Sequence, residues 1–236
     1  IRKTQVMILD KRADLGHGDV KKLLFSLSVP TITSQIVNML YNLVDRVFIG
    51  HMQPAETVGK LALTGVGVCL PIIMVISAFA SLMAIGGAPR ASIAEGAGES
   101  EKSERIMGNC LTMLVITALV LTVLFESFAE PLLLMFGASE NTVGYALDYM
   151  RIYALGTIFV QLTLGMNAYI TAQGFATVSM KTVLIGALLN TALDPLFIFV
   201  LGLGVRGAAL ATVISQAVSA VWVMTFLTGK KTRWHL

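Results

Sequence analysis

Asn190 and Asp194 lie one helical turn apart within a long apolar stretch, and Pro195 follows directly. A proline within a helix has no N–H of its own and obstructs the carbonyl four residues earlier, which leaves the Thr191 oxygen free beside the carboxylate. A carboxylate, an amide oxygen and a free carbonyl are hard oxygen ligands, suited to a proton or a small hard cation. Thr212 adds a hydroxyl on the next apolar stretch. These residues predict a cation-binding site.

A second polar face runs along an earlier apolar stretch. Its members are Thr31, Gln35, Asn38, Asn42 and Asp45, at steps of four, three, four and three. At about 100° per residue they fall within an arc of about 80° on a helix. Lipid cannot solvate such a stripe, so we expect it to face other helices or water.

Two further stretches carry polar faces of the same kind. Tyr149, Tyr153 and Asn167 lie near one line of a helix, and Gln216 lies one turn beyond Thr212. At about 1.5 Å per residue, Asp194 is roughly 10–14 Å from the outer end of its helix and Thr212 roughly 8–12 Å from that side. Because four helices bring polar groups to a similar depth, we expect one shared cavity in the outer half of the bilayer.

The composition requires that these residues sit in a membrane. The chain has 236 residues, of which 56% are hydrophobic and only 13% charged, and its mean hydropathy is +0.78. A soluble domain is about 25% charged. We expect an all-α integral membrane protein, a six-transmembrane-helix bundle between residues 23 and 229, after a tail over 1–22 and before a linker over 230–236. The expected spans are about 24–50, 61–87, 110–129, 143–172, 177–203 and 207–228.

The basic residues indicate the orientation. Thirteen Lys and Arg fall on one side of the predicted spans, against Lys60 and Arg206 on the other. Lys and Arg in short loops favour the cytoplasm, so both termini are expected there. Residues 89–107 mix both signs of charge at helical spacing and predict a solvated cytoplasmic helix. Arg151 lies three residues from Asp148 and is expected to pair with it or to reach toward the membrane surface.

Several function classes find no support. The chain has no G-x-x-x-x-G-K-[ST] phosphate loop, no H-E-x-x-H and no G-x-S-x-G motif, which argues against ATP-driven transport within this chain and against an enzyme. The basic residues flank the spans rather than forming a nucleic-acid surface. No organic cofactor and no nucleic-acid partner are expected.

Several motifs at linked spacing resemble one family. The run YNLVDRVFIG over Tyr41–Gly50 resembles the first-helix signature of the multidrug and toxic compound extrusion (MATE) exporters. NTALDP at 190–195 resembles their fifth-helix motif, and GAALAT at 207–212 resembles their sixth. GAS at 137–139 and TAQG at 171–174 also fit, and the likeness is greatest to the Mep-like branch of bacterial drug exporters.

The resemblance implies a secondary antiporter of the bacterial plasma (inner) membrane, which expels cationic or amphipathic drugs while H⁺ or Na⁺ enters. It implies cation coupling by Asp194, Asp45, Asn190, Thr212 and Tyr149, with Asp194, Asn190 and Thr212 as the set that could hold Na⁺. Asp194 is expected to be the main carboxylate and Asp45 the second. The expected substrate cavity is formed by Gln35, Asn38, Asn42, Tyr153, Asn167 and Gln216.

Members of that family have twelve helices in two six-helix lobes, whereas this chain predicts one lobe and no internal repeat. We therefore expect the amino-terminal lobe, apparently truncated, whose missing partner is a carboxy-terminal six-helix lobe. Two alternatives stay open at this point. The chain is a non-transporting membrane remnant or scaffold, or it is a flippase for lipid-linked sugars, for which basic cavity residues are expected.

Overall fold

The computed structural model describes residues 20–229 together with Thr232 and Trp234. Within these residues the chain forms helices and no strand, which confirms the expected all-α class. The helices are α2 (Val20–Gly50), α3 (Lys60–Val68), α4 (Leu70–Gly96), α5 (Ser100–Met135), α6 (Val143–Leu155), α7 (Thr157–Ala172), α8 (Ala176–Pro195) and α9 (Gly204–Leu227), with π-helical turns η1 (Ala55–Gly59) and η2 (Leu196–Val200).

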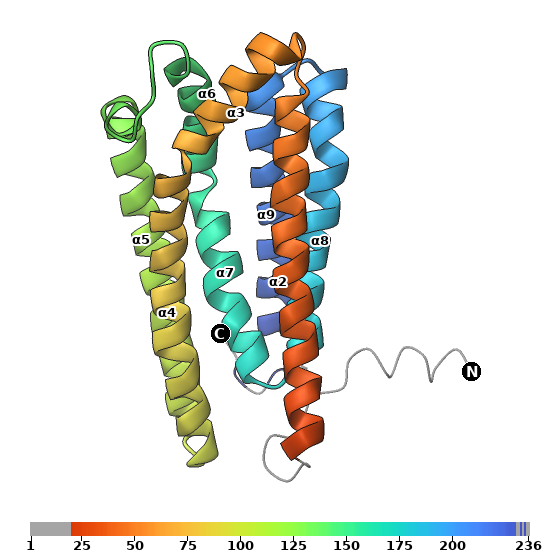
Figure 1. Ribbon diagram of the computed structural model, residues 1–236. Coiled ribbons are helices and arrows are strands. Elements are labelled where there is room, and N and C mark those ends of the chain that lie inside the picture. The colour runs from red at the N-terminus through yellow and green to blue at the C-terminus, as the bar shows by residue number, and fades with distance from the viewer. Residues whose placement is uncertain (1–19, 230–231, 233, 235–236) are drawn as a thin grey trace, which may run out of the picture.

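The helices form one elongated bundle (Figure 1). α4 and α5 pack together at one side, α2 packs on α8 at the other, and α7 and α9 lie between the two pairs. The described residues include five helices long and apolar enough to span a bilayer, or six when α6 and α7 are counted as one bent span. Large apolar side chains such as Phe25 and Met39 of α2 are exposed, as lipid contact requires.

The stretch expected as one span over 143–172 is broken. α6 and α7 meet at Gly156 and are bent by 57° relative to one another. A Cβ at Gly156 would lie 2.4 Å from Val213 Cγ2 of α9, so a larger residue could not bring the bend this close to α9. The stretch expected over 177–203 is also interrupted, because α8 ends at Pro195 and continues as the π-helical turn η2.

The expected cytoplasmic helix over residues 89–107 is wrong. α4 instead continues to Gly96, α5 begins at Ser100, and a tight turn joins them at Gly98, whose φ of +81° suits glycine. The mixed charges lie at the start of α5, where Glu101 and Arg105 form an i,i+4 ion pair at 2.7 Å. Such pairs stabilise a helix. The charged residues therefore belong to the first turns of α5 and not to a separate helix between α4 and α5.

The core has two parts along the bundle axis. One buried cluster includes Ile49, Ile76, Tyr149 and Ile198. It lies toward the end of the bundle where α3 and α6 are found. The second includes Met107, Leu114 and Tyr169 at the opposite end. It also contains Trp234, whose ring is buried after α9 ends, with the indole Nε1 donating to Glu95 of α4 at 3.2 Å. Trp234 therefore completes the second cluster.

The approach of α9 to η2 depends on Gly207. A Cβ at this position would lie 2.7 Å from the Phe197 carbonyl carbon and 2.8 Å from its oxygen, both of which are backbone atoms. We expect Gly207→Ala to push α9 away from η2 and to lower the free energy of unfolding by about 1–3 kcal/mol. The measurement is the midpoint of thermal unfolding in detergent micelles, followed by circular dichroism.

Gly144→Ala is the matched control, because a Cβ at Gly144 of α6 meets nothing within 4 Å. Its unfolding midpoint should stay the same or rise slightly, as for alanine replacing glycine in a helix. Equal midpoints for Gly207→Ala and the unchanged chain would contradict the close-packing role of Gly207.

Candidate functional site

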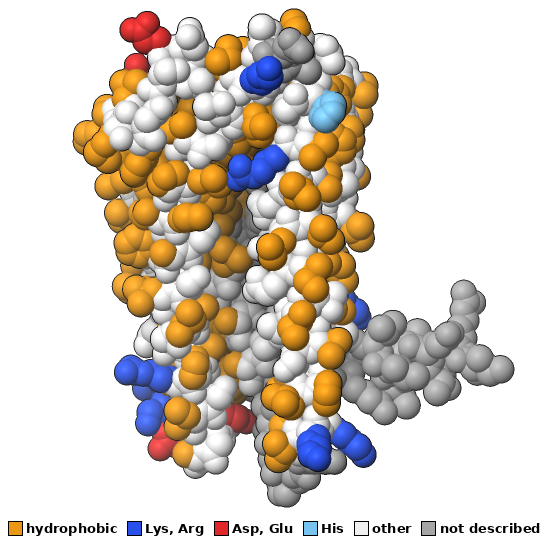
Figure 2. All heavy atoms as spheres, in the orientation of Figure 1, with side chains coloured by type: hydrophobic (Ala, Val, Ile, Leu, Met, Phe, Trp, Pro, Cys, Tyr) orange, Lys and Arg blue, Asp and Glu red, His pale blue; other side chains and the backbone are white. Residues whose placement is uncertain are grey.

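A cavity of about 170 Å³ opens between α2 and α4, with α6, α7 and α9 behind it. Figure 2 shows the hollow between the α2 and α4 columns, and apolar side chains cover most of the middle of the face around it. The expected site residues that line this cavity are Asn38, Asn42, Asp45, Tyr149, Tyr153, Thr212 and Gln216. Residues from three separate polar faces therefore meet at one place.

Asp45 and Tyr149 meet in this cavity. The Asp45 side chain is partly buried, and its Oδ1 atom is buried without a hydrogen-bond donor. Tyr149 of α6 is almost fully buried and lines the cavity together with Asp45 and Thr212. Its ring stacks on Tyr153, with the ring centroids 5.9 Å apart, which holds the phenol in place. Arg46 also lines the cavity beside Asp45.

Asp194 lies behind the cavity at the α8–α9 interface and is fully buried. The Asn190 Nδ2 atom donates to Asp194 Oδ1 at 3.2 Å and to Thr212 Oγ1 at 3.3 Å. One amide thus connects the carboxylate of α8 to the hydroxyl of α9. The three residues of the expected cation set are therefore in direct contact.

A smaller cavity of about 40 Å³ adjoins the first. Asn190 lines the smaller cavity, and Asn38, Thr212 and Gln216 line both. The Asp194 and Asp45 carboxylates are close enough to influence one another electrostatically. The two acids therefore belong to one polar region rather than to separate sites.

This region is rich in acceptors that lack donors. Asp194 Oδ2, Asn190 Oδ1, Gln216 Oε1 and Asp45 Oδ1 are all buried and accept no hydrogen bond from the described residues. A buried polar atom left unpaired costs about 1–3 kcal/mol, and more when it is charged. A proton on a carboxylate, a bound cation or water can satisfy these oxygens. The arrangement is therefore suited to binding a proton or a small cation and releasing it again.

Two of the expected cavity residues, Gln35 and Asn167, line neither cavity, and their role toward a substrate stays a prediction. Gln35 is exposed on α2, about 15 Å along the helix from Asp45, and lines neither cavity. Asn167 donates from Nδ2 to the Ser179 carbonyl at 3.2 Å and so joins α7 to α8. The prediction for Asn167 assumed one straight helix, but the bend at Gly156 turns α7 away from the line that holds Tyr149.

Sequence reasoning missed Tyr41, which lines both cavities. Tyr41 lies three residues after Asn38 and four before Asp45, so it shares their helix face. The spacing therefore places Tyr41 on the polar face of α2. The predicted stripe included only amide, aliphatic hydroxyl and acidic side chains and so left this phenol out. Ser215, another buried group without a donor or acceptor partner among the described residues, also lines the smaller cavity.

The expected local pair of Asp148 with Arg151 is wrong. Asp148 of α6 accepts instead from Arg206 Nη2 of α9 at 2.8 Å. Both side chains are partly exposed, so this ion pair contributes little to stability by itself. It does, however, connect α6, which carries Tyr149, to the start of α9, which carries Thr212.

The chain is similar to proteins of one transport family. The MatE family model matches residues 30–196. The multidrug export protein MepA of Staphylococcus haemolyticus is 29% identical over 214 residues, which is 91% of this chain and 46% of that protein. MepA of Staphylococcus aureus is 25% identical over 88% of this chain and 45% of that protein. The chain spans about half the length of the curated relatives it matches.

Solved structures agree with this assignment. A MATE protein crystallised in the bent conformation is 29% identical and has a TM-score of 0.85, over 93% of this chain and 48% of that one. A transporter of the MOP superfamily from Pyrococcus furiosus, described as having a binding pocket of reverse polarity, is 28% identical with a TM-score of 0.86, over 96% and 50%. The fold is thus one lobe of such a transporter, and the relatives are transporters rather than enzymes. The chain belongs to the MatE family.

Proposed function

We propose that this chain is the cation-coupling lobe of a secondary antiporter, which exports cationic or amphipathic drugs in exchange for H⁺ or Na⁺. The observation that carries the proposal is the joining of Asp194, Asn190 and Thr212 beside a cavity that also contains Asp45. Acidic residues within a membrane are costly and mark ion or substrate pathways. The relatives' names as multidrug export proteins support drugs as the substrate class.

The geometry supports an exchange at one region. A cation or a cationic drug entering the cavity meets Asp45 first, because Asp45 lines the open cavity while Asp194 is fully buried behind it. A proton on either carboxylate would satisfy an oxygen that otherwise lacks a donor. Binding of the cation then favours loss of the proton, since two positive charges compete for the same oxygens. Asn190 and Thr212 supply neutral oxygens for a bound Na⁺.

A flippase for lipid-linked sugars is the second candidate considered. Arg46 lines the larger cavity and is a basic group of the kind such a substrate requires. It lies directly beside Asp45, however, and Asp194 adds a second acid to the same region. The acidic groups therefore favour a cationic ligand and the exporter.

The proposed location is the bacterial plasma membrane, with both termini cytoplasmic. Lys21, Lys22, Arg90, Lys102 and Lys181 belong to the end of the bundle where α2 begins and α4 turns into α5. Lys60 and Arg206 belong to the other end, where α3 and α9 begin. Lys and Arg in short loops favour the cytoplasmic side of a membrane, so this distribution supports the proposed orientation. The cavity then lies toward the outer leaflet.

The proposed partner is a second six-helix lobe. In transporters built from two repeats, alternating access comes from one repeat rocking against the other around a shared site. Exposed polar residues of α2, such as Gln35 and Asn42, are then available to water or to the partner lobe.

Asp194→Asn keeps the shape of the side chain and removes its charge. In a protein that carries this chain together with a second lobe, we expect this variant to lose efflux driven by a pH or Na⁺ gradient, down to the background of empty vesicles. Asp45→Asn should weaken efflux less completely, because Asp45 is less buried and lies beside Arg46. The measurement is drug transport in reconstituted vesicles under an imposed ion gradient.

Asp148→Asn is the matched control, since Asp148 is a partly exposed acid paired with Arg206 outside the cavity. It should transport at close to the unchanged rate. Wild-type efflux by Asp194→Asn, at equal protein in the vesicles, would show that the coupling role belongs elsewhere.

The orientation is tested with cysteines at exposed positions of the two ends. Glu101→Cys lies at the start of α5 and Glu140→Cys lies between α5 and α6. An impermeant maleimide added to intact cells should label Glu140→Cys and should reach Glu101→Cys only after the cells are opened. The reverse pattern would contradict cytoplasmic termini.

The 236-residue chain expressed alone should not confer drug resistance, because rocking requires a second lobe. The measurement compares resistance of cells that express this chain with cells that express it fused to a second MatE lobe. Resistance from the chain alone, in a form shown by cross-linking to be monomeric, would contradict the need for a partner lobe.

A further inference from the structure

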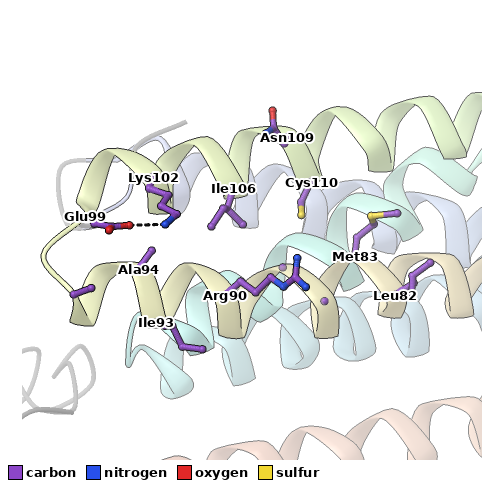
Figure 3. Close-up of a pocket in the computed structure, with 13 residues that line it drawn as sticks. Leu82, Met83, Arg90, Ile93, Ala94, Glu99, Lys102, Ile106, Asn109 and Cys110 are labelled. Atoms are coloured by element: carbon purple, nitrogen blue, oxygen red, sulfur yellow. Dashed lines mark hydrogen bonds and ion pairs between the residues drawn. The ribbon is translucent and has the colours of Figure 1, made fainter.

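A groove of about 760 Å³ lies between α4 and α5, close to the turn that joins them (Figure 3). None of its lining residues lines the two cavities near Asp194. Its walls combine charged side chains with long apolar ones. The lining residues that matter here are Leu82, Met83, Arg90, Glu99, Lys102 and Ile106.

Among the charged residues that line the groove, which are Arg90, Glu99 and Lys102, two pair with one another. Lys102 pairs with Glu99 at 2.7 Å within the groove, and Arg105 pairs with Glu101 at 2.7 Å outside it. Arg90 is exposed and forms no ion pair with any residue that the structure describes. Its side chain runs along α4 in the direction of Met83 and lines the groove (Figure 3). The groove therefore presents a guanidinium that is free to bind an anion.

Arg90 lies in the part of α4 that is close to the turn. α4 has 27 residues and is about 40 Å long, whereas the hydrocarbon core of a bilayer is about 30 Å thick. Arg90 lies six residues before the end of α4 at Gly96, or about 9 Å from the turn. Leu82 and Met83 lie about two turns further toward the middle of the bilayer. Arg90 thus lies nearer the turn than Leu82 and Met83, so a polar group and an apolar wall follow one another along the groove.

We propose that this groove binds one anionic phospholipid, with its phosphate on Arg90 and an acyl chain along Leu82, Met83 and Ile106. Arginine binds phosphate through two parallel N–H donors, which suits a single unpaired guanidinium. A zwitterionic lipid would bring its own cation beside Arg90 and Lys102 and so would bind less well. Under the orientation proposed above, this lipid comes from the cytoplasmic leaflet, where basic pockets between helices bind anionic headgroups. Binding itself depends neither on drug transport nor on the Asp194 site.

Cys110 provides a reporter, because its thiol lines the groove, whereas Cys69 is fully buried. The experiment measures the rate at which a neutral maleimide labels Cys110 in the complete 236-residue chain in detergent micelles. Phosphatidylglycerol, phosphatidylcholine, inorganic phosphate and a lipophilic cation are added in separate samples. Phosphatidylglycerol alone should slow the labelling.

Lipid retained by the purified protein, measured by native mass spectrometry, is the second readout. Arg90→Gln should retain about fivefold less phosphatidylglycerol, the change expected for one basic side chain near an anionic surface. Arg105→Gln is the control, since Arg105 is paired with Glu101 and does not line the groove. It should retain lipid like the unchanged chain.

A third pair of variants tests the groove without changing charge. Gly86 lines it, and a Cβ there meets nothing within 4 Å, so Gly86→Leu should fill the groove without disturbing the packed core. Gly108 on α5 is equally open but does not line the groove, so Gly108→Leu is its control. Only Gly86→Leu should lose bound phosphatidylglycerol.

Several results would overturn the proposal. Protection of Cys110 by inorganic phosphate alone would make this a site for a free anion, and equal protection by phosphatidylcholine would remove the selectivity for anionic lipid. Protection by the lipophilic cation would assign the groove to a drug. Unchanged lipid retention in both Arg90→Gln and Gly86→Leu would place the bound lipid elsewhere. Wild-type efflux by Asp194→Asn, which would contradict the proposed function, would by contrast leave each of these results unaffected.

Discussion

The Asn190 amide donates both to the Asp194 carboxylate and to the Thr212 hydroxyl, and the arrangement of the bundle around the site depends on this pair of hydrogen bonds. A carboxylate in hydrocarbon has no water to solvate it, so its helix must carry a partner and must pack where that partner can reach. The contact holds α8 and α9 together at the level of the cavity. Gly207, which precedes Thr212 on α9, permits η2, the continuation of α8, to approach α9 closely. The buried acid and the small residue therefore serve one interface.

The site also depends on places where helices stop being regular. The bend at Gly156 brings Tyr149 and Tyr153 toward α2 and α9 while α7 follows a different direction. α8 ends at Pro195, the residue after Asp194, and η2 then packs on Gly207. In a bilayer such interruptions are tolerated where protein or a polar cavity covers them. Their position beside the acids links the irregular backbone to the proposed exchange of cations.

Much of the site was predictable because single helices impose their own geometry. Asn38, Asn42 and Asp45 share a face of α2 by spacing alone, and they line the same cavity. Spacing along one helix does not predict how separate helices lie relative to one another. Asn167 lies beyond the bend at Gly156, which no motif in residues 143–172 predicted. Asp148 pairs with Arg206, which is 58 residues away in the chain. Spacing along one helix cannot reveal either relationship.

Composition and periodicity were enough to predict the membrane spans, the polar faces and the two acids. A polar group exposed to lipid costs free energy, so polar residues of a membrane protein fall on the helix faces that are covered by protein or water, and this spacing can be seen in the sequence. Which faces meet was decided by the fold. The rotation of each helix, its crossing with its neighbours and its breaks place Tyr41 in the cavity, Gln35 outside it and Trp234 in the core. Those arrangements result from many packing contacts between distant segments, and each contact depends on the shapes of both partners rather than on either sequence stretch alone.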